Sequence, residues 1–295
     1  MLLKSLIRGF FGQLWQSAAW LLATRTPLIN RIVQPAPGKP GWVRIGIRGS
    51  HFLMPDHPFW RASFSGWEPD TERIYRALVR PGDVVVDVGA WIGPTVMFAC
   101  ACQAGRILAI EPNPACQSSL DALAATIATR RSELLLCRCG IYTGAGEMEF
   151  GSPTGKVIAT SAASLRGTGT RIQVDTLPHV LAKYGIAAPT FVKIDIEGVE
   201  FDIADQIQSF ADMPGTHVFL SLHPPFVPDG NKRNGLLTAL EKFDIYDSSL
   251  RPITHDTVAT RVHSEVPRPG WGTEYGNYFE VLLVPRGESL KRAGP

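Results

Sequence analysis

The stretch VVVDVGAWIGP, residues 84–94, decides the fold. A continuous apolar segment leads through an aspartate, Asp87, into a turn that holds Gly89 and Gly93. An apolar run of this length is typical of a strand that is buried on both faces of a parallel sheet. Glycine permits the positive φ of a tight turn or the close approach of the next helix. We therefore predict a buried strand, a tight turn and a helix that begins near Pro94.

Strand patterns alternate with helix patterns from residue 83 to residue 285. This alternation is typical of a doubly wound α/β fold, in which helices cover both faces of a mostly parallel sheet. We expect the last strand to be antiparallel. The strands are predicted over 83–89, 106–112, 132–140, 171–175, 190–198, 217–223 and 278–285. Sheets of this kind bind ligands beyond the carboxyl ends of their strands.

The chain before this domain contains a break rich in proline and glycine, QPAPGKPGW at residues 34–42, which predicts a loop or linker. The segments VRIGI and HFLM after it could form a short hairpin. We predict four parts: an N-terminal amphipathic helix over 1–33, a linker with substrate-side elements over 34–82, the main domain over 83–285 and a tail over 286–295.

Apolar residues recur at helical spacing near the N-terminus, at Leu3, Ile7, Phe10, Phe11, Leu14 and Trp15, beside Lys4 and Arg8. Polar residues interrupt the stretch, no clear cleavage site follows, and its uncharged part is too short for a membrane-spanning helix. Two interpretations remain open. The helix packs on the domain, or it attaches the protein weakly to a membrane surface.

Charge and cysteine content restrict the class of protein. The formal net charge is +2, too small to suggest a nucleic-acid partner. The five cysteines are an odd number in a long chain, so a disulfide framework is not expected. The two C-x-C pairs raise the question of zinc, but they lie in apolar segments. We favour buried thiols in a reducing cytoplasm.

The turn and the next strand together indicate a nucleotide-like cofactor. Glu111 ends the second strand about twenty residues after the glycines, where an acid receives ribose hydroxyls. The turn lacks the G-x-G-x-x-G that a pyrophosphate requires. Asp87 would repel a pyrophosphate but could pair with an amino group. We therefore predict S-adenosylmethionine, bound at Asp87, Gly89, Ala90, Trp91, Gly93, Glu111, Pro112, Asn113, Gly140 and Asp195.

Five motifs occur in an order that resembles a known family: VVVDVGAWIG, AIEPNP, VDTL, FVKIDIEGVE and LSLHPP. Together they resemble the FkbM family of S-adenosylmethionine-dependent methyltransferases, over about residues 80–225. The resemblance implies a class I Rossmann-like fold and O-methylation of hydroxyls on sugars, polyketides or related metabolites. Two positions depart from the family, which usually has asparagine where Trp91 stands and another in the helix after EPNP. These departures make it unsafe to transfer the substrate.

A second polar group ends the later strands. Asp195 and Glu197 lie in KIDIEGVE, and His223 ends LSLH. They could hold a substrate hydroxyl, accept its proton or bind a divalent cation. Nothing in the sequence requires a metal, so none is predicted. We hypothesise that His223 is the base, because its usual pKa suits neutral pH. A structural ion-pair network around Lys193 is the alternative.

Three functions therefore compete. The favoured one is an S-adenosylmethionine-dependent O-methyltransferase, cytoplasmic or peripheral on the membrane, with a small-molecule or glycan hydroxyl as acceptor and no nucleic-acid partner. The others are a nicotinamide-dependent oxidoreductase and a non-catalytic methyltransferase-like binding module. The sequence leaves the acceptor and the oligomeric state open, although Trp60, Trp67, Trp271 and Tyr275 lie in segments expected to shape the acceptor site.

Overall fold

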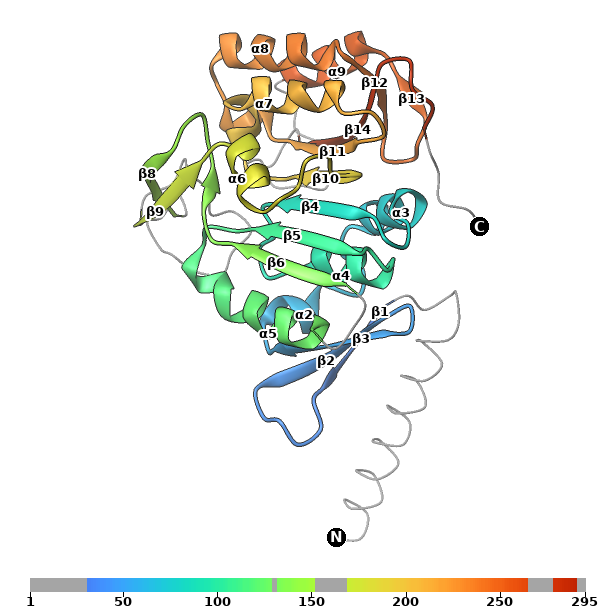
Figure 1. Ribbon diagram of the computed structural model, residues 1–295, viewed down its shortest axis with the longest axis vertical. Helices are drawn as coiled ribbons and strands as arrows, with labels where there is room; N and C mark the ends of the chain where they lie inside the picture. The colour runs from blue at the N-terminus through green and yellow to red at the C-terminus, as the bar shows by residue number, and fades with distance from the viewer. Residues whose placement is uncertain (1–30, 129–131, 152–168, 265–277, 291–295) are drawn as a thin grey trace, which may run out of the picture.

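The computed structural model describes residues 31–128, 132–151, 169–264 and 278–290 (Figure 1). Within them, an eight-stranded sheet has the strand order β13-β12-β14-β11-β10-β4-β5-β6. Its parallel strands are β4 (Val84–Val88), β5 (Arg106–Ile110), β6 (Glu133–Cys137), β10 (Phe191–Ile194) and β11 (His217–Leu222). Antiparallel pairing adds β14 (Phe279–Pro285), β12 (Phe243–Tyr246) and β13 (Pro252–Ile253).

The predicted fold class is confirmed, including the antiparallel last strand. The chain enters the sheet at β4, adds β5 and β6 on one side, and then crosses over to add β10 and β11 on the other. The strand order therefore reverses between β4 and β10. A crevice at such a reversal, beyond the carboxyl ends of the strands, is where doubly wound sheets bind ligands.

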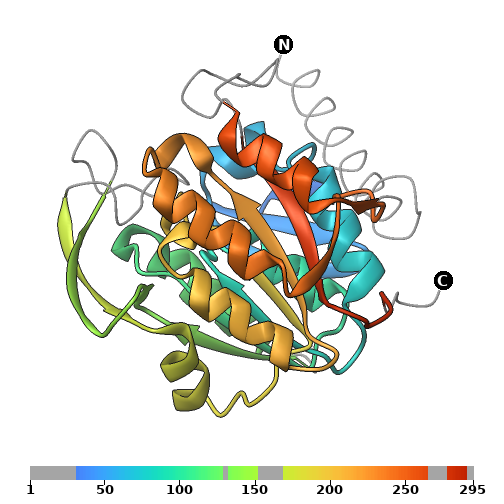
Figure 2. The ribbon, with the colours of Figure 1, turned by 90° about the horizontal axis from the view of Figure 1, so that it is seen from above.

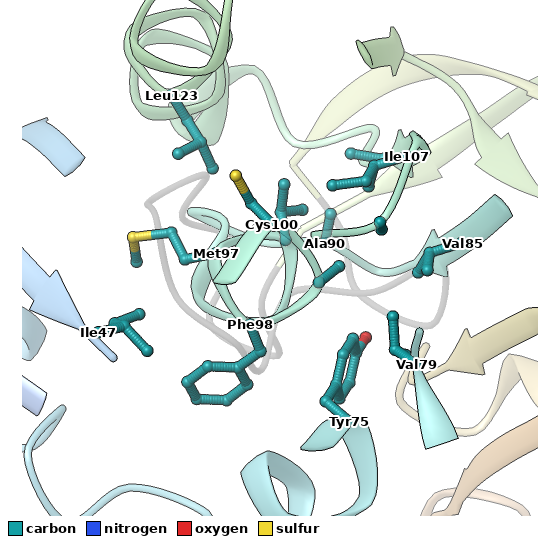
Figure 3. Packing of buried hydrophobic residues seen from close by; sticks show 14 of the residues in the cluster. Ile47, Tyr75, Val79, Val85, Ala90, Met97, Phe98, Cys100, Ile107 and Leu123 are labelled. Carbon is teal, nitrogen blue, oxygen red and sulfur yellow. The ribbon is translucent and has the colours of Figure 1, made fainter. Parts of the chain in front are cut away.

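Alternating side chains of β4 serve two hydrophobic cores. Val85 belongs to the core formed with α3 (Pro69–Leu78), α4 (Pro94–Ala101) and α5 (Gln117–Ile127). Figure 3 shows part of it, with the ring of Tyr75 beside that of Phe98. Val86 and Val88 belong to the core of the other face, with α6 (Leu177–Lys183), α7 (Ala204–Gln208), α8 (Gly230–Leu240) and α9 (His255–His263). Helices thus cover both faces, as a parallel sheet requires.

The segment before β4 forms a packed layer and not a linker. It contains an antiparallel sheet of β1 (Arg31–Pro35), β2 (Trp42–Ile47) and β3 (Ser50–Pro55), followed by α2 (Pro58–Ala62). This sheet lies beside α5 (Figure 1). The predicted hairpin is therefore present. Residues 1–30 of the predicted N-terminal helix lie outside the described residues, and 31–33 belong to β1, contrary to that prediction.

A buried ion pair joins β1 to α3. Arg31 Nε lies 2.9 Å from Glu72 Oε2, and both side chains are almost fully buried. The guanidinium also donates to the carbonyl oxygens of Phe64 and Trp67, and it lies over the rings of Phe64 and Phe98. The first strand is thereby attached to the segment that supplies Trp67.

A third, small sheet lies at the side of the main sheet (Figure 2). It pairs β9 (Thr170–Asp175) with β7 (Gly140–Ile141) and β8 (Gly146–Phe150). Short 3-10 helices occur at Pro114–Cys116, Val199–Phe201, Ser209–Asp212 and Pro224–Phe226. Among the helices of the described residues, none has the length and apolar character needed to cross a membrane.

Candidate active site

A cavity of about 400 Å³ lies beyond the carboxyl ends of β4, β5 and β10, where the strand order reverses. This volume lies within the usual range for small-molecule sites, about 300–1,000 Å³. Nine residues predicted as site residues line it: Gly89, Ala90, Trp91, Glu111, Pro112, Gly140, Asp195, Glu197 and His223. Three others, Asp87, Gly93 and Asn113, are not among the lining residues.

The glycine turn is held against two neighbouring strands. Gly89 has a φ of +86°, and its N–H donates to the carbonyl of Ile110 at the end of β5. A Cβ at this position would stand 1.9 Å from the carbonyl oxygen of Asp195. Only glycine allows the turn after β4 to approach the end of β10 this closely.

Glu111 connects the turn to the second strand. Its Oε2 accepts the N–H of Trp91 at 2.8 Å, and its Oε1 accepts the N–H of Asn113 at 2.7 Å. The carboxyl group is therefore fixed in orientation at the cavity wall. Each carboxylate oxygen can accept more than one hydrogen bond, so Glu111 keeps the capacity to receive hydroxyls from a ligand.

Three predicted cofactor contacts have structural roles instead. Asp87 is fully buried below the cavity and accepts a hydrogen bond of 2.5 Å from Thr95 Oγ1. Gly93 allows α5 to approach, since a Cβ there would stand 2.6 Å from Leu123 Cδ2. The side chain of Asn113 caps the turn at Pro114–Cys116. The prediction that Asp87 pairs directly with a ligand amino group does not fit this position.

The end of β10 brings a lysine, two acids and a histidine together. Strand β10 stops at Ile194, four residues earlier than predicted. Lys193 donates to Asp195 Oδ2 at 2.8 Å. His223 Nε2 lies 3.5 Å from Asp195 Oδ1 and 3.7 Å from Glu197 Oε2. Glu197 adopts a φ of +54°, an uncommon conformation for a residue with a side chain, and such residues concentrate at functional sites.

Glu200 fixes the histidine from the opposite side. Its Oε1 accepts the backbone N–H of His223 at 2.7 Å and lies 3.1 Å from the ring Nδ1. Its Oε2 accepts the N–H of Gly198 at 2.8 Å. The ring of His223 also stacks on Phe226. These contacts direct Nε2 toward Asp195 and Glu197.

Residues 87–209 match the family model of the methyltransferase FkbM domain. The chain therefore carries a methyltransferase FkbM domain. The match includes the glycine turn, Glu111 and the acids from Asp195 to Glu200, and it ends before His223. S-adenosylmethionine is the cofactor of this family, and the sheet has the class I Rossmann-like order that the family implies.

Solved structures give weaker similarities. A methyltransferase FkbM from Methylobacillus flagellatus KT is 16% identical, with 72% of this chain and 50% of that chain covered, at a TM-score of 0.43. A candidate SAM-dependent methyltransferase from Streptococcus mutans is 9% identical, with 85% of this chain and 57% of that chain covered, at a TM-score of 0.44. A candidate methyltransferase in complex with SAH is 8% identical, with 85% of this chain and 58% of that chain covered, at a TM-score of 0.45.

The chain thus spans about half the length of these solved structures. At these TM-scores the alignments add nothing to the assignment of the fold, which rests on the strand order. No curated protein is significantly similar to the chain.

Burial and neighbouring charges set the protonation of the acids in the FkbM domain. Burial raises the pKa of Glu111 to about 7, and the two backbone N–H groups oppose this rise. Burial also raises the pKa of Glu197 to about 7. Burial would raise the pKa of Asp195 as well, but the charges of Lys193 and His223, with the hydrogen bond from Lys193, together outweigh it and lower that pKa. Asp195 is therefore the anionic member of the pair at neutral pH.

His223 is cationic at neutral pH in the protein without ligands. Burial disfavours the imidazolium, but Glu200, Glu197 and Asp195 outweigh this effect and raise the pKa of His223 to about 9. A protonated histidine cannot accept a proton. This charge state does not fit the hypothesis that His223 is the general base at neutral pH.

Sequence reasoning missed a second polar group, which comes from outside the matched segment. Glu68 lines the cavity with a φ of +39°, and its Oε2 accepts a hydrogen bond from Thr71 Oγ1. Tyr278 donates to Glu280 Oε1 at the start of β14, and the Thr71 hydroxyl oxygen lies 3.1 Å from the same atom. Burial and Glu280 raise the pKa of Glu68 to about 8. The one local feature that distinguishes Glu68 is its positive φ, and the sequence does not reveal a backbone angle.

The other predicted candidates have varied positions. All five cysteines are free, and among the described residues none belongs to a group that could hold a metal ion. Trp67 lines the cavity, whereas Trp60 is buried in the core. Trp271 and Tyr275 lie outside the described residues.

Proposed function

We propose that the protein is an S-adenosylmethionine-dependent methyltransferase that methylates a hydroxyl oxygen of a small molecule or glycan. The observation that carries the proposal is a single cavity that contains both Glu111 and the Asp195–Glu197–His223 group. The first belongs to the cofactor end, and the second can orient an alcohol and manage its proton.

At the cofactor end, Glu111 would accept the ribose hydroxyls of S-adenosylmethionine. Its fixed orientation supports this role, because both oxygens are already held by backbone N–H groups. The wall formed by the turn has no glycine-rich cradle of amides for a pyrophosphate. This feature favours S-adenosylmethionine over a nicotinamide dinucleotide.

The proposed reaction is a displacement at the sulfonium methyl. The acceptor oxygen forms a bond to the methyl carbon as the carbon–sulfur bond breaks, which yields a methyl ether and S-adenosylhomocysteine. The hydroxyl proton must leave, and a positioned group that removes it contributes about 10²–10⁴-fold. A carboxyl group with a pKa of about 7, as at Glu197, suits proton acceptance near neutral pH better than an imidazolium.

Within this proposal, His223 has a different role from the one hypothesised from the sequence. It holds Asp195 and Glu197 at one edge of the cavity, and Glu200 fixes its ring. Asp195 would orient the acceptor hydroxyl, because Lys193 keeps it anionic.

Two measurements test the proposal. Calorimetric titration should give binding of S-adenosylhomocysteine and none of NAD. Turnover with S-adenosylmethionine and a panel of hydroxylated acceptors should give a product that is one methylene heavier, detected by mass spectrometry. Tight NAD binding without a response to S-adenosylhomocysteine would favour the oxidoreductase. Cofactor binding without turnover on any acceptor of the panel would favour a non-catalytic binding module.

The predicted domain limits and location belong to the same proposal. Residues 83–285 would form the methyltransferase unit, and the layer before β4 would close the acceptor side through Trp67 and Glu68. We propose a cytoplasmic location, because all five cysteines are free.

A further inference from the structure

The Asp195–Glu197–His223 group leaves a gap between its polar atoms. The distances of 3.5 and 3.7 Å from His223 Nε2 to the two carboxylates are too long for ordinary hydrogen bonds. Two atoms that each ligate one ion at about 2.0–2.2 Å can be no more than about 4.4 Å apart. Both distances therefore suit ligands of a common ion better than hydrogen-bonded partners.

An unpartnered carboxylate oxygen supports this interpretation independently. Glu197 is only 9% exposed, and none of the described residues donates a hydrogen bond to its Oε2. Burial of such an oxygen without a hydrogen-bond donor is costly. Glu197 has a positive φ, which residues with a side chain rarely adopt, and Gly198 continues the sharp turn after β10. Strain of this kind and an orphaned oxygen at one residue indicate that a ligand belongs there.

The histidine is prepared as a ligand. Glu200 Oε1 contacts Nδ1 at 3.1 Å, which leaves Nε2 toward the gap. A cation bound there would replace the proton that Nε2 carries in the protein without ligands, and that proton would pass to solvent. A carboxylate that accepts from the second ring nitrogen is the usual partner of a metal-ligating histidine, because it fixes the tautomer and makes the ring a stronger donor. Glu200 is fully buried, and its oxygens also accept two backbone N–H groups, so its position is fixed.

We propose that Asp195, Glu197 and His223 bind one divalent cation at the edge of the cavity. Two carboxylate oxygens and one imidazole nitrogen suit a cation between the hard and soft extremes, such as Mn²⁺. Three ligands from the protein leave coordination positions open. All three residues line the cavity, so an acceptor oxygen could occupy one of these positions.

The ion would change the chemistry of the acceptor. A divalent cation lowers the pKa of an oxygen that it binds, and it neutralises the excess of carboxylates at this edge. With the ion bound, Glu197 would be a ligand, and the lowered pKa of the bound hydroxyl would replace proton acceptance by Glu197. This role in activating a hydroxyl rests on the function proposed above, whereas binding of the ion does not. Lys193 keeps its contact to Asp195 Oδ2, and the other oxygen, Oδ1, faces the histidine.

The test is the binding of Mn²⁺ to the full chain, followed by electron paramagnetic resonance and calorimetry, without cofactor or acceptor. We expect one Mn²⁺ per chain, displaced by Zn²⁺, with a ¹⁴N coupling from an imidazole in pulsed spectra. Loss of a partner that orients a ligating histidine costs about 10–100-fold in affinity, which is the effect expected for Glu200→Ala. Loss of a ligand in Glu197→Gln or His223→Gln should cost more than about 100-fold.

Glu149→Gln is the matched control. It removes a carboxylate from the exposed surface of strand β8, which does not belong to the three-ligand group. Its Mn²⁺ affinity should stay within about twofold of the wild type. Circular dichroism checks the fold of each variant, and the ¹⁴N coupling of the wild type tests the site even if a variant fails to fold.

The proposal is overturned if the wild type binds none of Mn²⁺, Mg²⁺ and Zn²⁺, if Glu197→Gln and His223→Gln bind as the wild type does, or if bound Mn²⁺ has no imidazole coupling. Titration of S-adenosylhomocysteine on the same samples separates the two proposals. Cofactor binding without Mn²⁺ binding rejects the cation site alone, and Mn²⁺ binding without cofactor binding rejects the proposed function alone.

Discussion

Gly89 and the carbonyl of Asp195 are in such close contact that no other residue fits at position 89. A Cβ on Gly89 would stand 1.9 Å from the Asp195 oxygen, and 3.0 Å from its carbonyl carbon. The contact joins the turn after β4 to the chain that leaves β10. Gly89 therefore sets the distance between the turn after β4, which lines the cavity beside Glu111, and the acids Asp195 and Glu197 after β10.

Gly89→Ala should abolish binding of S-adenosylhomocysteine and lower the melting temperature, because the turn must move away from β10. The positive φ adds about 1–2 kcal/mol of strain to this clash. Gly287→Ala is the control, since Gly287 has a φ of +83° with no atom within 4 Å of its Cβ position. It should lose stability through strain alone and keep its affinity. Equal affinities of both variants would show that the close contact is not needed for binding.

Glu111→Gln should weaken the binding of S-adenosylhomocysteine by about 1–3 kcal/mol in calorimetry, because a charged acceptor of ribose hydroxyls is lost. Glu149→Gln, on the exposed surface of β8, removes an equal charge and should leave the affinity unchanged. An unchanged affinity in Glu111→Gln would exclude Glu111 from the cofactor site.

Cofactor affinity should also depend on pH through Glu111. Burial raises the pKa of Glu111 to about 7, above its usual value of 4.5. The ionised form is the better acceptor, so the affinity for S-adenosylhomocysteine should rise as the pH increases from 6 to 8 and then level off. The same titration in Glu111→Gln should lose this rise. A rise that persists in the variant would assign the titration to another group.

Glu197→Gln should lower kcat by about 10²–10⁴-fold while the affinity for S-adenosylhomocysteine stays nearly unchanged, because Glu197 acts at the acceptor and not at the cofactor. Asp195→Asn should impair both quantities, since Asp195 lies where the acidic group meets the turn. Steady-state kinetics and calorimetry measure the two separately. Wild-type turnover in Glu197→Gln would remove Glu197 from the proton transfer.

Arg31→Met should destabilise the protein by about 3–5 kcal/mol in urea unfolding, because it leaves the buried carboxylate of Glu72 without its cation. The double variant Arg31→Met with Glu72→Leu should recover much of this loss, since no unpaired charge remains. If the double variant is no more stable than Arg31→Met alone, the cost arises from the lost contacts of Arg31 to Phe64 and Trp67 instead.

Deletion of residues 1–24 tests the predicted N-terminal helix. If the helix is a surface anchor, the truncated protein should no longer sediment with anionic vesicles, and its thermal unfolding should stay unchanged. Unfolding of the truncated protein would show that the helix packs on the domain. Equal vesicle binding of both forms would exclude the helix as an anchor.

The sequence determined the fold class because its signals are local. An apolar run such as 84–88 cannot face water on either side, and alternation of such runs with helices allows few arrangements besides a parallel sheet covered on both faces. The glycines after β4 and the acid after β5 were recognisable for the same reason. The need for glycine arises from the turn itself, and the position of the acid follows from the end of the strand beside it.

Local signals misplaced some element boundaries. The strand predicted over 132–140 ends at Cys137, and the one predicted over 190–198 ends at Ile194. Strands β12 and β13 and helix α9 were missed, because short or weakly patterned elements form only when a neighbouring strand or sheet face covers them.

Only the tertiary structure decided which acids share the cavity and how they are charged. Asp87 was predicted beside the ligand, but the pleat of β4 directs it into the core, where Thr95 satisfies one of its oxygens. Glu68 and Tyr278 lie more than 200 residues apart in the chain, yet both line the cavity. Glu200 follows β10, and it contacts His223 at the end of the neighbouring strand β11. Such contacts depend on long-range packing, which brings distant segments together and removes water from between their charges, and no local pattern in the sequence encodes either effect.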